Sequence, residues 1–196
     1  MDPPLPRGQD RLGHAADPSP SLIPDARPLT SDMTATKRTT PLAGLGHVPW
    51  PEIKDSTGSA AAIPSLLTTL ARGDADSAGP ALGQLRQRIC QFGFVVDQAT
   101  AATVPFLWEL VRLPQVTCRA EILRLLKSIA DARQWETTAA TYPKLHHHPD
   151  DYVGWEREAR HAVHAQRDVL RHLQREPEPD AEMVRATTEL AATLDG

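Results

Sequence analysis

Apolar residues recur every three or four positions from about residue 59 onward, which is the spacing of amphipathic α-helices. Proline or glycine interrupts this pattern at several points, and both residues commonly mark helix ends. The pattern predicts helices over 59–72, 80–92, 100–113, 117–135, 155–175 and 180–194. Phe92 falls on the apolar stripe of the second helix, so we expect it to face the core. We therefore expect an all-α fold, with residues 136–152 as a loop.

Part of this pattern occurs twice. Ile63-Pro64 falls on Val104-Pro105 after a shift of 41 positions, and leucines align beyond each proline. Ser59 and Thr100 precede the two copies, and we expect their side-chain oxygens to cap helix N-termini. A repeated helix pair of ~40–47 residues is typical of HEAT and armadillo proteins, where neighbouring pairs stack to bury their apolar faces. The repeat predicts a short HEAT-like α-solenoid of about three helical hairpins.

Several short motifs support this interpretation. Trp50, Thr57-Gly58-Ser59-Ala60, Ile63-Pro64-x-Leu66-Leu67 and Val104-Pro105-Phe106-Leu107 together resemble a group of short HEAT-repeat proteins common in actinobacteria, over roughly residues 50–194. The resemblance implies a helical-repeat fold and a binding role, and it implies no reaction. The group carries His-Ala-Tyr-Gly and His-Gln-Gly where this chain has Asp55-Ser56-Thr57-Gly58 and Gln91-Phe92-Gly93. Because both histidines are missing, no chemistry of those relatives is carried over.

Residues 1–46 differ from the rest of the chain. Ten of the 18 prolines lie in residues 1–51, and the segment shows no periodic apolar pattern. Such a composition buries too little apolar surface to offset chain entropy, so we expect a disordered Pro-rich segment over 1–46 and a helical domain over 47–196. The tail is either a Pro-rich ligand or an upstream extension, since Met33 is a second candidate start.

Composition excludes some classes of function. The net charge is −4 and the pI is near 6.0, which argues against broad binding of phosphate backbones. Cys90 and Cys118 provide neither a disulfide framework nor a CxxC pair, and we expect both to be buried apolar residues. The chain has no apolar run of the ~18–20 residues that a membrane span requires and no signal-peptide pattern. We therefore expect a cytoplasmic protein without membrane association.

Histidines form the densest concentration of metal-ligating residues. His146, His147 and His148 are consecutive, while His161 and His164 lie one turn apart on a predicted helix. His146, His148, His161 and His164 are thus the candidate zinc ligands, and an enzyme or metal-binding protein using this loop and helix 155–175 stays an alternative. Consecutive histidines converge poorly on one ion and no His-Glu-x-x-His occurs, so a solvated loop is favoured.

No catalytic or nucleotide-binding motif occurs, and we assign no catalytic residue and no cofactor. Glu156 is interpreted as a solvated residue at a helix start. Arginines give helix 155–175 a basic side, but interspersed acidic residues disfavour the further alternative, a nucleic-acid-binding repeat. The leading hypothesis is a non-catalytic module that binds another protein. Its candidate contacts are polar residues of the second helices of the hairpins: Arg86, Gln87, Arg124, Lys127 and Arg185.

Overall fold

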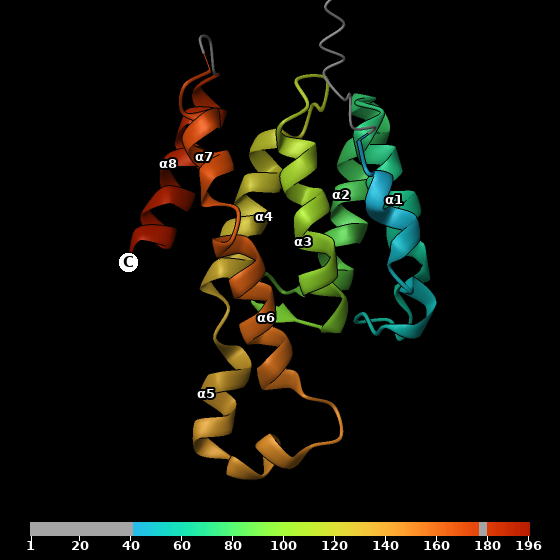
Figure 1. The fold of residues 1–196 in the computed structure, drawn as a ribbon, viewed down its shortest axis with the longest axis vertical. Helices are drawn as coiled ribbons and strands as arrows, with labels where there is room; N and C mark the ends of the chain where they lie inside the picture. The colour runs from blue at the N-terminus through green and yellow to red at the C-terminus, as the bar shows by residue number, and fades with distance from the viewer. Residues whose placement is uncertain (1–40, 177–179) are drawn as a thin grey trace, which may run out of the picture. The chain divides into compact units, whose positions relative to one another are not determined.

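A computed structural model describes residues 41–176 and 180–196, and the expected all-α fold is confirmed (Figure 1). Disorder was expected over 1–46, and residues 1–40 of that range lie outside the described residues, as do the ligand role of the tail and the alternative start at Met33. Residues 43–46 are ordered in a 3-10 helix, so the expected boundary is wrong there. The α-helices of the described part are α1 (Ile63–Ala71), α2 (Ala75–Ile89), α3 (Gln98–Val111), α4 (Arg119–Asp131), α5 (Gln134–Thr141), α6 (Tyr152–His164), α7 (Arg167–Leu173) and α8 (Ala181–Asp195).

Short elements connect the helices. Four are 3-10 helices: η1 (Ala43–His47), η2 (Trp50–Glu52), η3 (Ala60–Ala62) and η4 (Pro143–His147). Two strands of two residues each, β1 (Cys90–Gln91) and β2 (Val95–Val96), form an antiparallel hairpin between α2 and α3.

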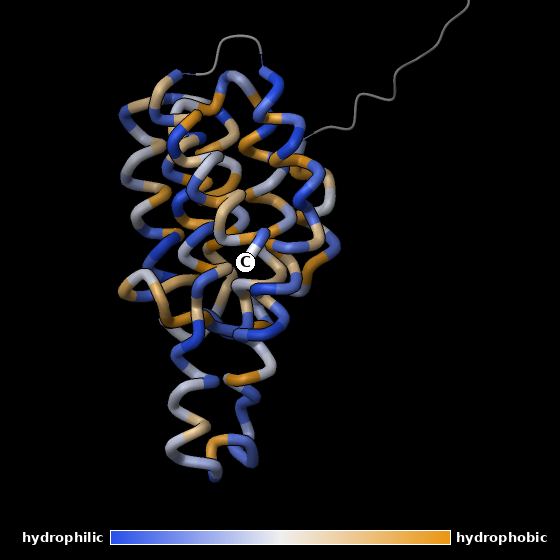
Figure 2. Tube along the Cα trace, turned by 90° about the vertical axis from the view of Figure 1, so that its left-hand side faces the viewer, coloured by the Kyte–Doolittle hydropathy of each residue, from blue (hydrophilic) through white to orange (hydrophobic). Residues whose placement is uncertain are grey.

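The helices pack in succession. Helix α1 packs against α2 and α3, while α3 packs against α4 and α6, and α4 packs against α8 (Figure 1). The shared core is built mainly from leucine, isoleucine and valine, and Leu67, Leu85, Leu107 and Leu126 are fully buried. Helix α4 buries apolar residues on several sides, because α3, α6 and α8 all cover it. Apolar residues are concentrated away from α5 and η4 (Figure 2).

Two local predictions about helix starts are wrong. Helix α2 begins at Ala75 rather than near Pro80, because Asp74 accepts a hydrogen bond from the Asp76 backbone N–H (3.3 Å) and caps an additional turn. Asp97, not Thr100, holds the N-cap position of α3, and the Thr100 hydroxyl accepts from the Asp97 N–H at 3.0 Å in a capping box. By contrast, Ser59 caps η3 as expected, by accepting from the Ala61 N–H at 3.4 Å.

The helices in the second half of the chain are interrupted more often than the apolar pattern predicts. The helix expected over 117–135 ends at Asp131, and the expected loop contains most of α5 and all of η4. The helix expected over 155–175 is divided into α6 and α7. Helix α6 packs on α3 and α4, whereas α7 packs on α8, so the two segments face different neighbours.

The two repeat-defining prolines occupy different positions in their helices. Pro64 lies in the first turn of α1, directly after η3, whereas Pro105 lies in the interior of α3. Proline has no N–H and cannot close a helical hydrogen bond, so it is tolerated most easily in a first turn. Helix α3 begins earlier in its copy of the repeat than α1 does, which moves Pro105 inward. The helices that carry the two prolines nevertheless lie against each other.

Candidate partner-binding surface

The β1–β2 hairpin holds two phenylalanines in solvent. Cys90 pairs with Val96 and Gln91 with Val95, and the Phe94 N–H donates to the Gln91 carbonyl at 3.2 Å. Phe92 is 79% exposed and Phe94 is 48% exposed, and their ring centroids are 6.3 Å apart. The expectation that Phe92 faces the core is therefore wrong, because α2 ends at Ile89 and the chain turns outward.

The turn that exposes these rings has an unusual backbone. Phe92 and Gly93 both have positive φ values, of 55° and 84°, as in a type I′ turn. Glycine adopts this region freely, but a bulky residue is disfavoured there because its Cβ approaches the backbone. The turn therefore keeps a phenylalanine where glycine or asparagine would cost less. Strain of this kind is found at functional sites more often than elsewhere.

Arg86 and Gln87, two of the five expected contact residues, lie beside this hairpin. Both are exposed on the last turns of α2 and line a shallow pocket of ≈ 490 Å³ with Phe92, Gly93, Cys90, Gln91, Ser56 and Thr57. Arg86 Nη2 lies 3.6 Å from the position that a Cβ on Gly93 would occupy. Within the part of the chain that the structure describes, Arg86 forms no ion pair.

The segment after η2 fixes this pocket against the end of α2. The buried Asp55 carboxylate accepts from Arg88 Nη1 (2.7 Å) and from the Thr57 hydroxyl (2.7 Å). Ser56 donates through its N–H to the Arg88 carbonyl (3.1 Å) and through its hydroxyl to the Gln87 carbonyl (2.6 Å). The two arginines of this turn therefore differ. Arg88 pairs with the buried Asp55, while the Arg86 guanidinium is available to a partner.

A groove between α2 and α4 adjoins the same arginine. It has a volume of ≈ 400 Å³ and is lined by Ala75, Gly79, Leu82, Gly83 and Arg86 of α2 and by Thr117, Cys118, Glu121 and Leu125. Nothing lies within 4 Å of the position of a Cβ on either Gly79 or Gly83. Glycine inside a helix is unfavourable relative to alanine, yet here it keeps the floor of the groove open.

The other expected contact residues are paired within the chain. Arg124 of α4 contacts Glu182 of α8, and this pair joins the two helices. Glu182 also lies 3.3 Å from Arg185 on its own helix. Lys127 pairs with Asp131 on its own helix at 2.6 Å. The structure therefore places Arg86 and Gln87 at one surface and the remaining three elsewhere.

The candidate zinc ligands do not converge. His146 and His147 are exposed on η4, whereas His148 packs against Tyr152 (ring centroids 4.9 Å apart) and accepts from the Asp150 N–H. His161 and His164 lie on α6. Burial of the imidazole lowers the pKa of His164, and the positive charge of Arg167 lowers it further. Over residues 41–176 and 180–196, no three histidine, cysteine, aspartate or glutamate side chains are placed to hold a metal ion.

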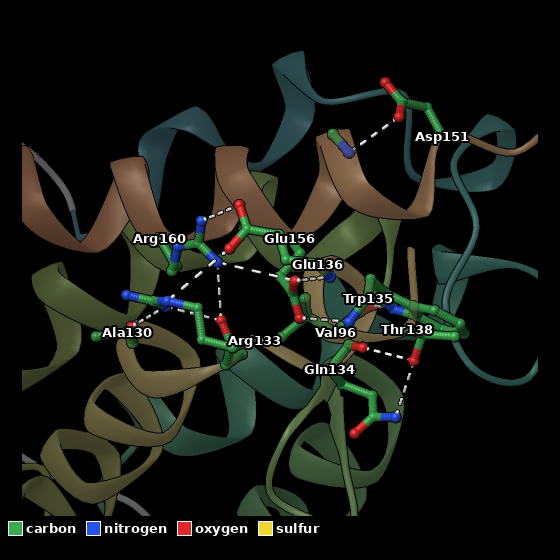
Figure 3. Close-up of polar contacts among 12 residues, drawn as sticks. Val96, Ala130, Arg133, Gln134, Trp135, Glu136, Thr138, Asp151, Glu156 and Arg160 are labelled. Carbon is green, nitrogen blue, oxygen red and sulfur yellow. Dashed lines mark hydrogen bonds and ion pairs between the residues drawn. The ribbon is translucent and has the colours of Figure 1, made fainter. Parts of the chain in front are cut away.

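Glu156 is a structural residue instead of a solvated one, so that interpretation is wrong. Its fully buried carboxylate accepts from the backbone N–H groups of Trp135 (3.0 Å) and Glu136 (2.9 Å) at the start of α5 (Figure 3). Arg160 completes the network by donating to the Ala132 carbonyl (2.9 Å) and to Glu136 (2.6 Å). The hydrogen bond from Arg160 lowers the pKa of Glu136. This network anchors α5 to α6.

Two more buried groups bear on chemistry. Burial raises the pKa of the Cys90 thiol to about 12, which keeps it protonated and unreactive, and Cys118 is also buried, as expected. Asp97 lies at the N-terminus of α3, and its Oδ2 is buried without a hydrogen-bond partner in the described residues. Two causes raise the pKa of Asp97 to about 6: burial of its carboxyl group is the larger, and the negative charge of Asp55 is the smaller.

The fold and this surface define an all-α chain with an exposed aromatic hairpin beside an open groove. No protein-family model, no curated protein and no solved structure matches the chain. In the residues described, no helix has both the length and the apolar character needed to cross a bilayer.

Proposed function

We propose that the chain is a non-catalytic protein-binding module built on a short HEAT-like solenoid. The order of packing supports the solenoid, because α1, α3 and α6 contact one another in succession while α2 and α4 lie behind α1 and α3. Stacked helical hairpins of this kind present extended surfaces to partners. The partner contacts the hairpin tip, which consists of Phe92, Gly93 and Phe94, together with the neighbouring Arg86.

The single observation that carries this proposal is the exposure of Phe92 on a turn that disfavours it. Aromatic residues and arginine are enriched in protein–protein interfaces, where a few such residues supply most of the binding free energy. An exposed aromatic pair gains little from water, but it gains substantially when a partner buries it. Arg86, next to the tip, adds a charged group that can pair with a carboxylate of the partner.

Affinity capture from a lysate of the source cells tests this function. Phe92→Ser should lose the captured proteins, because it removes the main apolar contact while leaving the core untouched. Tyr142→Ser is the matched control, since Tyr142 is another exposed aromatic residue (67%) and lies outside this surface. Captured proteins that depend on Tyr142 as strongly as on Phe92, or on neither residue, would refute the proposed surface.

A further inference from the structure

We propose that the partner at this surface is a second copy of the same chain. The hairpin tip of each molecule docks into the α2–α4 groove of the other, in a symmetric dimer. This inference rests on the proposed function and narrows it to self-association.

The tip and the groove are complementary in shape and polarity. The tip projects two apolar rings. The groove is lined by the edges of the largely buried Leu82 and Leu125 and by the exposed Gly83, where a Cβ would meet nothing within 4 Å. Its volume of ≈ 400 Å³ suits the insertion of a large side chain, and no described residue fills the space above the glycines. The tip is an exposed apolar surface, and together the tip and the groove form a projection and a recess.

Charge follows the same division. The Arg86 guanidinium lies beside the turn and accompanies the tip, so the tip is apolar and positive. Glu121 lines the groove and gives it one carboxylate, although Arg86 of the same molecule lines it too. Glu121 is only weakly engaged within the chain, since its carboxylate is 3.8 Å from Arg124 and its side chain is 56% exposed. Docking of a tip into a groove therefore brings an arginine toward a glutamate of the other molecule.

The positions of the two features favour a closed pair. Arg86 lines both the groove and the pocket beside the hairpin, so the tip and the groove adjoin each other on one surface. In a twofold-symmetric dimer, each contact of one copy is repeated by the other, so one patch must supply both halves of the interaction. A tip and a groove on opposite faces would instead extend into a filament.

Sedimentation equilibrium of the full chain over roughly 1–200 µM is the first test, and a reversible dimer is expected in this range. Phe92→Ser, which removes the ring from the tip, should weaken association at least about 10-fold. Gly83→Leu, which fills the groove, should do the same. Tyr142→Ser and Arg171→Glu should leave association unchanged, because both positions lie outside the tip and the groove. Circular dichroism confirms that each variant is folded.

A charge exchange tests the pairing itself. Arg86→Glu alone and Glu121→Arg alone should each weaken self-association about 10-fold, because like charges then face each other. A mixture of the two single variants should associate again. In the mixed dimer, the tip that carries Arg86→Glu meets the groove that carries Glu121→Arg, and the unchanged Arg86 of one variant meets the unchanged Glu121 of the other. If either substitution damages the fold instead, mixing the two variants should not restore association.

Several outcomes would overturn this inference. They are a wild-type monomer at every concentration, a dimer unaffected by Phe92→Ser and Gly83→Leu, and a failure of the two charge variants to associate when mixed. A monomer whose lysate partners still depend on Phe92 would refute self-association and leave the proposed function intact. A monomer that sediments with phosphatidylcholine–phosphatidylserine vesicles through Phe92 would assign the tip to a membrane surface and overturn both.

Discussion

Phe92 offers a direct test of the backbone argument, because its φ of 55° is a conformation that glycine adopts without steric cost. We predict that Phe92→Gly is more stable than Phe92→Ala. This order is the reverse of that found in helix or strand interiors, where alanine is the more stabilising residue. Both variants remove the ring, so the contacts of the lost side chain cancel when the two variants are compared.

The expected difference follows from two opposing terms. A non-glycine residue in the left-handed region costs roughly 1–2 kcal/mol, which Phe92→Ala retains and Phe92→Gly removes. Glycine costs roughly 0.5–1 kcal/mol more in backbone entropy when the chain folds. Phe92→Gly should therefore have a free energy of unfolding about 0.5–1 kcal/mol above that of Phe92→Ala. For a domain of this size, the midpoint of thermal unfolding should differ by roughly 1–4 °C.

Urea unfolding followed by far-UV circular dichroism measures this difference. The samples should be dilute enough for self-association to contribute nothing to stability. Phe94 supplies the matched control, because it belongs to the same hairpin but is not among the residues with positive φ. Phe94→Ala should therefore be at least as stable as Phe94→Gly. Greater stability of alanine at position 92, or the same glycine–alanine difference at both positions, would refute the reasoning.

Asp97, Glu156 and the α6 histidines each lead to a further expected outcome. Because the pKa of Asp97 is raised from 3.8 to about 6 in the folded chain, the stability from its protonation is complete below pH 3.8 and is lost as the pH rises through 6. Asp97→Asn should remove about 1–2 kcal/mol of the pH dependence of the free energy of unfolding, a figure reduced for the partial exposure of the group. The same pH dependence of urea unfolding in the wild type and the variant would contradict this. Glu156→Gln should lower the free energy of unfolding by about 2–3 kcal/mol and should speed hydrogen exchange at the Trp135 and Glu136 amides. Unchanged hydrogen exchange at these two amides would contradict the capping role of Glu156. Zinc should leave the melting temperature unchanged, and a rise that His161→Ala abolishes would restore the metal-binding alternative.

Apolar periodicity predicts the parts of the fold whose stability is decided locally. The stripes of α1 and α4 are regular, and most of the residues on them are buried where the pattern places them. Ser59 caps the element that follows it, as expected, because a cap requires only a side-chain oxygen two or three residues from an amide. Asp180 caps α8 in the same way. These features depend on neighbours in the sequence, which is why one sequence is sufficient to find them.

Features that depend on distant residues could not be predicted in this way. Helix α5 begins where it does because Glu156, on another helix, accepts from its first amides. Arg124 was expected to contact a partner, but Glu182 of α8 engages it, and this pairing depends on how α4 packs against α8. Strands of two residues are too short to show the alternation of apolar and polar residues that predicts a strand. The apolar period of α2 therefore continues in the sequence as far as Phe92, and the side chain of this residue was wrongly expected in the core.

The last turn of α2 shows why this surface is suited to binding. Arg86 and Arg88 are two positions apart and face different surroundings. The buried Asp55 holds Arg88, and Ser56 bonds to the backbone of the same turn, so the wall of the pocket is fixed before any partner arrives. A rigid wall reduces the conformational entropy that association must remove. Phe92 is likewise held outward by its turn, so its ring needs little reorganisation to dock. Under the proposed function, the backbone cost of Phe92 is offset on binding rather than on folding. Stability and association should therefore respond in opposite directions to Phe92→Gly.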